Sequence, residues 1–84
     1  MITKEGEFEL DGELQNLGIT NYKFLEIENT SGSNIEISIN DGVARTYEPG
    51  ALYRSPSIEI NHLYEDEIKI RGTNGTKINY SYVI

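Results

Sequence analysis

The side chains that most often carry acid–base or metal chemistry are scarce in this chain. His62 is the only histidine, and there is no cysteine. A histidine-based metal cluster or a cysteine–histidine pair therefore cannot be assembled from these residues. We interpret His62 as an exposed or capping residue near a strand end. No disulfide or thiolate metal site holds the chain together either.

Carboxylates are abundant but poorly arranged for catalysis. The chain has 14 acidic and 7 basic residues, and the acids are interleaved along predicted strands. Glycoside hydrolysis needs two carboxyl groups about 5–10 Å apart across a cleft, and a chain this short barely forms a cleft. The acidic turn at residues 65–67 lacks the spaced oxygen ligands of a calcium loop. We interpret the carboxylates on strands as solvated strand faces, namely Glu26, Glu28, Glu36 and Glu59.

Nucleophile and phosphate-binding motifs are missing as well. The serines lie in predicted turns and exposed strand positions, without a G-x-S-x-G elbow. The segment Gly72-Thr73-Asn74-Gly75 predicts a hairpin turn, because no helix or lysine follows it in the register of a phosphate loop. We therefore predict a protein that is not an enzyme, with no catalytic, cofactor-binding or metal-binding residues.

The net charge of −7 sets limits on possible partners. An acidic chain is repelled by nucleic acid and by anionic membranes, so we expect neither as a direct partner. The charge suits a soluble protein, or one that docks onto a basic surface. No apolar run approaches membrane-spanning length and no secretory signal follows Met1, which predicts a soluble protein made without a signal peptide.

The length of the chain limits how stable it can be alone. Its 84 residues suffice for one small domain with one core. Because a smaller chain buries a smaller share of its surface on folding, such a domain is only marginally stable by itself. We therefore expect the protein to gain stability by oligomerising or by docking onto a partner.

Residues 34–47 carry the clearest structural pattern. Isoleucines at positions 35, 37 and 39 alternate with polar residues, which is typical of a half-buried strand. Asn40-Asp41-Gly42 supplies turn chemistry, and we expect the positive φ at Gly42. A three-residue loop sets Ile39 opposite Val43 and Ile35 opposite Tyr47, so the apolar residues share one face.

A second hairpin is expected at the C-terminal end. Ile70 and Ile78 pair on one face if Thr73-Asn74-Gly75 form a three-residue loop with Gly75 in the left-handed region. Further strands are predicted at residues 22–28, at residues 57–63 and from residue 68 onward.

The first segment, residues 4–17, leaves two interpretations open. Its acids occupy odd positions and its first apolar residues even ones, which favours a strand or an extended arm. A helix is the alternative, because Leu10, Leu14 and Leu17 have helical spacing. Glycines at positions 6, 12 and 18 disfavour that helix.

Closely spaced short strands with turns between them indicate an all-β fold. We predict a small antiparallel β-sandwich, immunoglobulin-like or jelly-roll-like, with about seven or eight short strands. We assign residues 1–20 to an acidic N-terminal arm or first strand, and residues 21–84 to the β-sandwich domain.

The tyrosines divide into two groups by position. Tyr47, Tyr80 and Tyr82 share the parity of neighbouring isoleucines, which predicts places in the core. Tyr53 and Tyr64 lie next to predicted turns and are the better candidates for an interface, because an aromatic ring offers a large contact area with a polar tip.

One longer pattern joins these elements. It runs F-L-E-I-E-N-x-S-G-x-N-I-x-I-S-I-N-D-G over residues 24–42, then through a tyrosine strand, Pro49-Gly50, S-I-E-I at residues 57–60 and I-K-I-R-G-T at residues 68–73. This pattern resembles small β-sandwich structural proteins of tailed bacteriophage virions, found as capsid decoration, head-fibre or tail components. The resemblance covers about residues 22–84. It implies a non-enzymatic assembly role, with repeated copies on a symmetric particle.

The resemblance leads us to expect a virion protein, made in the bacterial host cytoplasm, that decorates or stabilises a capsid or joins virion components. Its expected partners are other virion proteins, capsid or tail subunits, and further copies of itself as a homo-oligomer. We expect the acidic segment to meet a basic surface of such a partner, with two apolar side chains burying area. The contact residues would be Glu5, Glu7, Glu9, Asp11 and Glu13, with Phe8 and Leu10.

Two other functions are compatible with the residues. A glycan- or receptor-binding module of a phage tail or fibre would use Tyr53 and Tyr64, and an exposed coplanar aromatic platform would support it. An acidic inhibitor that mimics DNA would need carboxylates spaced like phosphates along one face, for which the net charge of −7 is small.

Overall fold

The computed structural model describes residues 2–55 and 63–84, which form eight β-strands and no helix. All the strand pairs are antiparallel and make two sheets, so the predicted all-β sandwich is confirmed. The strands are β1 (Thr3–Glu9), β2 (Gln15–Asn16), β3 (Phe24–Glu28), β4 (Ile35–Ile39), β5 (Arg45–Tyr47), β6 (Leu52–Arg54), β7 (Ile68–Arg71) and β8 (Lys77–Val83).

The strand predicted at residues 57–63 falls, apart from Leu63, outside the described residues, and so does His62. Within the described ranges no helix is long and apolar enough to cross a membrane.

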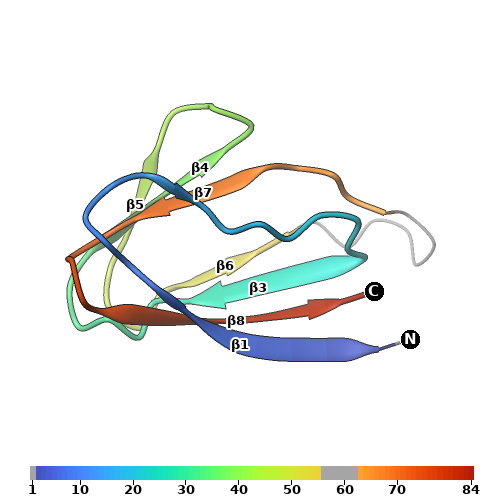
Figure 1. Ribbon diagram of the computed structural model, residues 1–84, viewed down its shortest axis with the longest axis horizontal. Coiled ribbons are helices and arrows are strands. Elements are labelled where there is room, and N and C mark those ends of the chain that lie inside the picture. Colours follow the sequence, from blue (N-terminus) through green and yellow to red (C-terminus); the bar gives the residue numbers. More distant parts are fainter. Residues whose placement is uncertain (1, 56–62) are drawn as a thin grey trace.

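The two sheets are stacked, with sheet A below sheet B in Figure 1. Sheet A has the strand order β1-β8-β3-β6, and sheet B has the order β2-β7-β4-β5. The first and last strands of the chain are neighbours in sheet A, and Ile2 and Ile84 exchange backbone hydrogen bonds of 3.3 and 3.0 Å. Among the described strands, β4 and β5 are the only consecutive pair in one sheet, so the other connections cross between the sheets.

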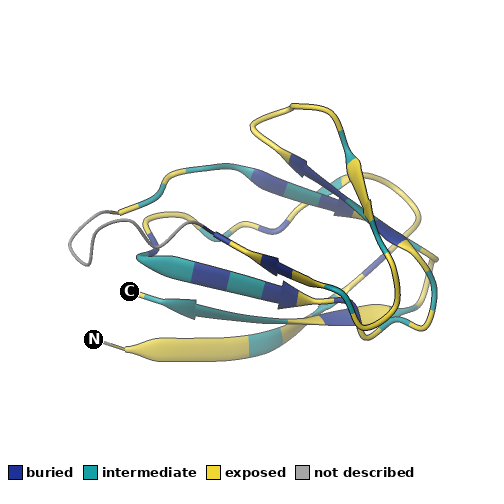
Figure 2. Ribbon diagram, turned by 180° about the vertical axis from the view of Figure 1, so that it is seen from behind, coloured by how far each residue is buried: buried dark blue, intermediate teal, exposed yellow. Residues whose placement is uncertain are grey.

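Alternation along each strand decides which side chains fill the space between the sheets. Figure 2 shows buried positions in dark blue alternating with more exposed ones along several strands. Burying one such aliphatic side chain contributes roughly 1.5–3 kcal/mol to the free energy of unfolding. The inward-facing aliphatic residues are all 3% exposed or less: Leu25, Ile27 and Ile78 from sheet A, and Ile35, Ile37, Ile68 and Ile70 from sheet B.

The hairpin of β4 and β5 has the predicted register but a different turn. Ile35 pairs with Tyr47, as expected from the alternation. The positive φ angles lie at Asn40 (52°) and Asp41 (58°), and not at Gly42. The Gly42 N–H donates to the Ile39 carbonyl at 2.9 Å, which makes a two-residue turn of type I′.

Asparagine and aspartate tolerate the left-handed region, so no glycine is required within this turn. One extra residue after the turn restores the predicted register, in the manner of a bulge. The described ladder between β4 and β5 ends at Ile37 and Arg45, and Val43 is 90% exposed. Val43 is therefore not part of the apolar face predicted for it.

The predicted C-terminal hairpin is wrong. β7 lies in sheet B and β8 in sheet A, so Ile70 and Ile78 do not pair. Gly75 has the expected positive φ of 85°, but its N–H donates to the Leu10 carbonyl at 2.8 Å. The turn therefore carries the chain from one sheet to the other. Both isoleucines are buried in the shared core, which they face from opposite sheets. This removes them from water as well as pairing within one sheet would.

The N-terminal segment is a strand over Thr3–Glu9, and the helical alternative is wrong for it. β1 pairs along its whole length with β8, from Thr3 opposite Val83 to Glu9 opposite Lys77. The leucines that suggested a helix lie beyond the strand: Leu10 and Leu17 are in the core, and Leu14 is partly exposed. Their helical spacing arises because Leu10 and Leu17 reach the same core from two separate places in an extended chain.

Candidate protein interface

The outer face of sheet A carries two rows of glutamates on either side of β8. In the register of the sheet, Glu5 lies opposite Ser81 and Ser81 opposite Glu26, while Asn79 lies between Glu7 and Glu28. Neighbouring strands are about 4.8 Å apart, so the two rows are about 10 Å apart. These residues, with Gly6 and Tyr80, line an open depression of about 430 Å³. We call it the acidic groove and define it by Glu5, Glu7, Glu26 and Glu28, with Asn79 and Ser81 between the rows.

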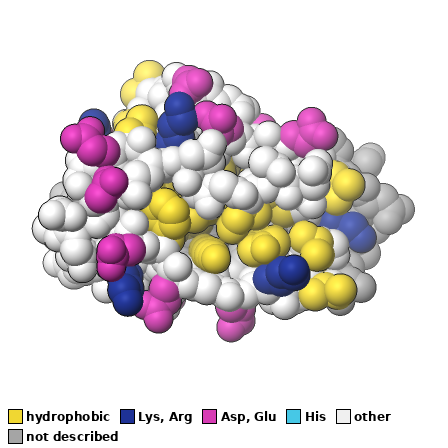
Figure 3. Space-filling view, in the orientation of Figure 1, with side chains coloured by type: hydrophobic (Ala, Val, Ile, Leu, Met, Phe, Trp, Pro, Cys, Tyr) yellow, Lys and Arg dark blue, Asp and Glu magenta, His cyan; other side chains and the backbone are white. Residues whose placement is uncertain are grey.

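The charge of the acidic groove is largely uncompensated. Glu26 makes an ion pair with Arg54, Nε to Oε2 at 2.8 Å. Within the described ranges, none of the ion pairs involves Glu5, Glu7 or Glu28. Figure 3 shows acidic side chains along the lower rim of the molecule, where Figure 1 places sheet A, with basic side chains among them. Three carboxylates therefore face solvent close to one another with no cation at ion-pair distance, although Lys77 lies on the same face opposite Glu9.

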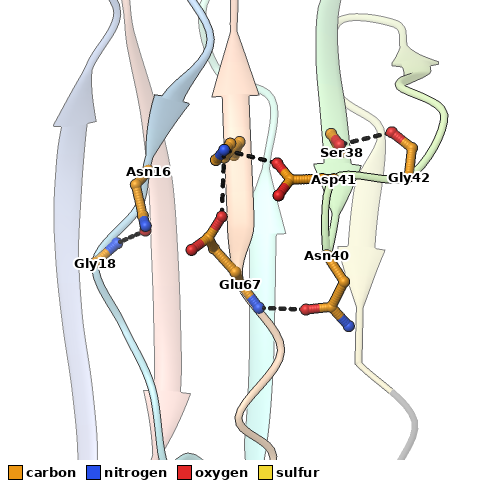
Figure 4. Close-up of polar contacts among 8 residues, drawn as sticks. Asn16, Gly18, Ser38, Asn40, Asp41, Gly42 and Glu67 are labelled. Atoms are coloured by element: carbon orange, nitrogen blue, oxygen red, sulfur yellow. Dashed lines mark hydrogen bonds and ion pairs between the residues drawn. The ribbon is translucent and has the colours of Figure 1, made fainter.

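The outer face of sheet B has the opposite character, because its charges are paired. Lys69 Nζ lies 2.6 Å from Asp41 Oδ1 and 3.3 Å from Glu67 Oε1 (Figure 4). Hydrogen bonds to Asp41 and then to Glu67 raise the pKa of Lys69, which keeps it charged. Arg71 Nη2 lies 3.0 Å from Glu36 Oε1. Each described cation on this face thus has a carboxylate partner, in contrast to the carboxylates of the acidic groove.

The predicted contact residues of the first strand divide between its two faces. Glu5, Glu7 and Glu9 share the outer face of β1, as the alternation predicted. Phe8 lies on the other face, where it is half-buried and packs against the core. Leu10 is 1% exposed. Its predicted role in burying area against a partner is therefore wrong, because its side chain already fills the protein's own core.

Asp11 and Glu13 lie in the connection after β1, outside the acidic groove. The Asp11 Oδ1 atom accepts a hydrogen bond of 2.9 Å from the Glu13 N–H, and the Asp11 N–H donates to Gln15 Oε1 at 3.1 Å. These contacts shape a turn. Both side chains are exposed, but the structure does not bring them together with the carboxylates of β1 and β3.

The two tyrosines proposed for an interface do not form an exposed aromatic platform. Tyr53 is 8% exposed and meets the edge of the Tyr47 ring at a centroid distance of 6.3 Å. Burial, followed by the charge of Asp66, raises the pKa of Tyr53. Tyr64 is half-buried and stacks on the fully buried Tyr22 at 5.9 Å. The rings of Tyr53 and Tyr64 therefore serve mainly to pack the protein's own interior.

Sequence reasoning missed the contribution of β3 to this surface. Glu26 and Glu28 were interpreted as part of solvated strand faces, and their alternation on a predicted strand was the available signal. What brings them beside Glu5 and Glu7 is the insertion of β8 between β1 and β3. These three strands are far apart in the sequence, so a local sequence pattern cannot predict that they are adjacent in the sheet.

The chemistry available to the acidic groove is electrostatic. No three histidine, cysteine, aspartate or glutamate side chains in the described residues are grouped so that they could hold a metal ion. The carboxylates stand on a solvated sheet face rather than in an enclosed pocket. Two parallel rows of negative charge of this kind attract a complementary basic surface, with a strength that salt screens.

Comparison with protein-family models, with curated proteins and with solved structures finds no match to this chain.

Proposed function

We propose that this protein is a non-enzymatic structural module that binds a basic protein surface through the acidic groove. The observation that carries the proposal is the asymmetry between the two outer faces of the sandwich. On the outer face of sheet B, Lys69 and Arg71 are both paired with carboxylates. On the outer face of sheet A, Glu5, Glu7 and Glu28 have no ion-pair partner among the described residues. Uncompensated like charges on a folded surface repel each other, and a basic partner relieves that repulsion.

The second part of the proposal concerns the assembly in which the module works. We propose a tailed bacteriophage virion, in which copies of the protein decorate a capsid or join head-fibre or tail components. The support for this part is the resemblance of residues 22–84 to small virion β-sandwiches. A small single-core sandwich suits such a role, since it gains stability when it docks onto a larger particle.

The test uses virion particles that lack this protein. They are produced from a phage in which the gene for this protein has been deleted. Purified wild-type protein is mixed with these particles and its co-sedimentation is measured at low and at raised salt. We expect binding that weakens with salt. The double variant Glu7→Gln/Glu28→Gln should bind about tenfold more weakly, as expected when two interfacial charges are lost.

A matched control neutralises two glutamates on the other face. Glu36→Gln/Glu67→Gln removes the same two charges from the sheet B side, where Glu36 is paired with Arg71 and Glu67 with Lys69. This variant should bind the particles like the wild type. The proposal fails if wild-type protein does not co-sediment, or if Glu36→Gln/Glu67→Gln weakens binding as much as Glu7→Gln/Glu28→Gln does.

A further inference from the structure

The outer edge of β1 carries backbone groups that no described residue uses. Ile2 and Ile84 exchange backbone hydrogen bonds, and the Leu10 N–H donates to the Thr76 carbonyl at 2.8 Å. Because hydrogen-bonded pairs alternate along an antiparallel ladder, the even residues of β1 bond to β8. The N–H and C=O groups of the odd residues therefore point away from the sheet, at Thr3, Glu5, Glu7 and Glu9.

This edge is the longest in the described part of the sandwich. β1 has seven residues, or about 24 Å of extended chain, whereas the other edge strands β2, β5 and β6 have two or three. Natural sheets protect long edges with proline, bulges or charge. β1 has no proline, and its pairing with β8 is continuous without a bulge. Its protection consists of the charges of Glu5, Glu7 and Glu9.

The inward side of the same edge is mainly apolar and incompletely covered, with Lys4 opposite Tyr82 as its charged residue on β1. Phe8, Tyr80 and Tyr82 lie on the inner face of β1 and β8, and all three are half-buried. The rings of Tyr80 and Tyr82 are stacked at 6.1 Å. Figure 3 shows hydrophobic side chains gathered along the side of the sandwich between the two sheets, above the lower rim of acidic side chains. The edge of β1 thus separates an apolar strip from the acidic groove.

A strand added beside β1 would meet both surfaces at once. Side chains alternate across an extended strand, so one set would continue the inner face next to Phe8 and the other would lie beside the glutamates. A second copy of β1 suits this place poorly, because it would set its own glutamates against Glu5 and Glu7. A segment that alternates apolar residues with lysine or arginine satisfies the backbone, the apolar strip and the carboxylates together.

We propose that β1 binds an extended segment of its partner by strand addition, and that this segment alternates basic and apolar residues. The proposal rests on the proposed function, since it specifies how a basic partner engages the acidic face. Main-chain hydrogen bonds along the edge supply the affinity, and the alternation of side chains supplies the specificity.

The test pairs a synthetic probe with two variants at one position. The probe is a capped peptide of alternating lysine and valine as long as β1, and its control is a scrambled peptide of the same composition. Glu7→Gln removes one charge and keeps the outward N–H, whereas Glu7→Pro removes the charge and that N–H. Edge strands tolerate proline where the N–H faces solvent, and the preceding Gly6 imposes no side-chain clash.

Binding of the peptides is measured by fluorescence anisotropy. We expect the alternating peptide to bind wild-type protein about tenfold more tightly than the scrambled one, and Glu7→Pro to bind it at least about tenfold more weakly than Glu7→Gln. Hydrogen exchange on the wild-type complex gives a readout that needs no variant. The amides of Thr3, Glu5, Glu7 and Glu9 should become protected, and the result stands even if Glu7→Pro fails to fold.

Other outcomes overturn the inference in distinguishable ways. Equal binding of the two peptides, equal effects of the two variants, or no protection of the four amides would exclude strand addition while leaving charge-based docking on the acidic face intact. Failure of the wild type to co-sediment with particles would instead remove the proposed function. A dimer detected by sedimentation with the same four amides protected would identify a second copy as the occupant and contradict the proposed partner.

Discussion

At the scale of single residues, the buried side chain of Asn29 holds one loop of the fold in place. It is 2% exposed, and its Nδ2 donates to the carbonyls of Ser33 and Tyr47 at 2.8 and 2.9 Å. Its Oδ1 accepts from the N–H and the hydroxyl of Ser31. One buried amide therefore ties the β3–β4 loop to the end of β5, and it uses both its donors and its acceptor to do so.

Replacing this amide by a carboxylate of the same shape tests that role. Asn29→Asp cannot donate to the two carbonyls, so we expect a loss of about 2–4 kcal/mol of unfolding free energy, roughly the cost of two orphaned buried acceptors. Urea denaturation at neutral pH measures it. Thr30→Ala is the neighbouring control, because its exposed hydroxyl makes one bond to the Lys77 carbonyl. Equal small losses in both variants would contradict the assignment.

A second residue-scale prediction concerns the buried tyrosines and alkaline pH. Burial is the largest cause that raises the pKa of both Tyr22 and Tyr53 above the ordinary tyrosine value. In the unfolded chain these tyrosines lose their protons near pH 10, whereas in the folded chain they keep them to higher pH. Above about pH 10 the unfolded chain therefore binds fewer protons than the folded chain. Unfolding free energy should therefore fall as the pH rises through this range.

The variant Tyr22→Phe isolates one contribution to this slope. The Tyr22 hydroxyl is buried without a hydrogen-bond partner in the described residues, so its loss should leave stability at neutral pH unchanged or higher. The same variant should show a shallower decline above about pH 10, measured by urea denaturation across a pH series. A stability that is flat or rises in alkali for the wild type would show that the sign of this prediction is wrong.

At the scale of elements, Gly6 lets β1 fit beside β8. A Cβ at position 6 would lie 2.5 Å from the hydroxyl oxygen and 2.7 Å from the Cζ atom of Tyr80. The two residues are cross-strand partners, so the tyrosine ring lies over the glycine backbone. Glycine weakens a strand by propensity, but at this position it leaves space for the Tyr80 ring.

Gly6→Ala should therefore destabilise the protein, although alanine is otherwise the better residue in a strand. We expect a loss of about 1–3 kcal/mol, the usual cost of overpacking, measured by thermal or urea denaturation. In a Tyr80→Ala background the clash is gone, so the same Gly6→Ala change should be neutral or stabilising. Additive losses in this double-mutant cycle would rule out a contact between the two positions.

At the scale of the whole molecule, we predict that charge on the open edge of β1 opposes edge-to-edge pairing of two copies. β1 presents a long unpaired edge whose chief protection is Glu5, Glu7 and Glu9. Neutralising them as Glu5→Gln/Glu7→Gln/Glu9→Gln should promote edge-to-edge association, seen as a concentration-dependent rise in mass by sedimentation velocity.

The control for this prediction removes equal charge elsewhere. Glu13, Glu48 and Glu65 are exposed and lie outside the strands, and their triple replacement by glutamine changes the net charge by the same amount. It should leave the mass unchanged. Association in both triple variants would point to net charge, rather than to the β1 edge, as the cause.

Local sequence patterns were sufficient to predict a large part of this fold. Alternation correctly predicted that Ile35 and Ile37 are buried and that Ile35 pairs with Tyr47. It failed at the end of the strand, where Ile39 is 36% exposed. The same kind of pattern failed for Ile70 and Ile78, since an inward-facing residue can be hidden by a neighbour in its own sheet or by the opposite sheet. For the acidic surface, the glutamates of β1 were predicted, but Leu10 was placed on the wrong side and Glu26 and Glu28 were missed.

The division between sequence and tertiary structure therefore has a physical basis. Side-chain alternation and turn residues act over a few positions, so the sequence alone determined the all-β class, the inward faces and the places where the chain turns. Which strands become neighbours in a sheet depends on segments that are far apart in the sequence and have similar patterns. Only the packing of the whole chain selects one arrangement. That packing put β8 between β1 and β3, which assembled the acidic groove and left β1 as an open edge.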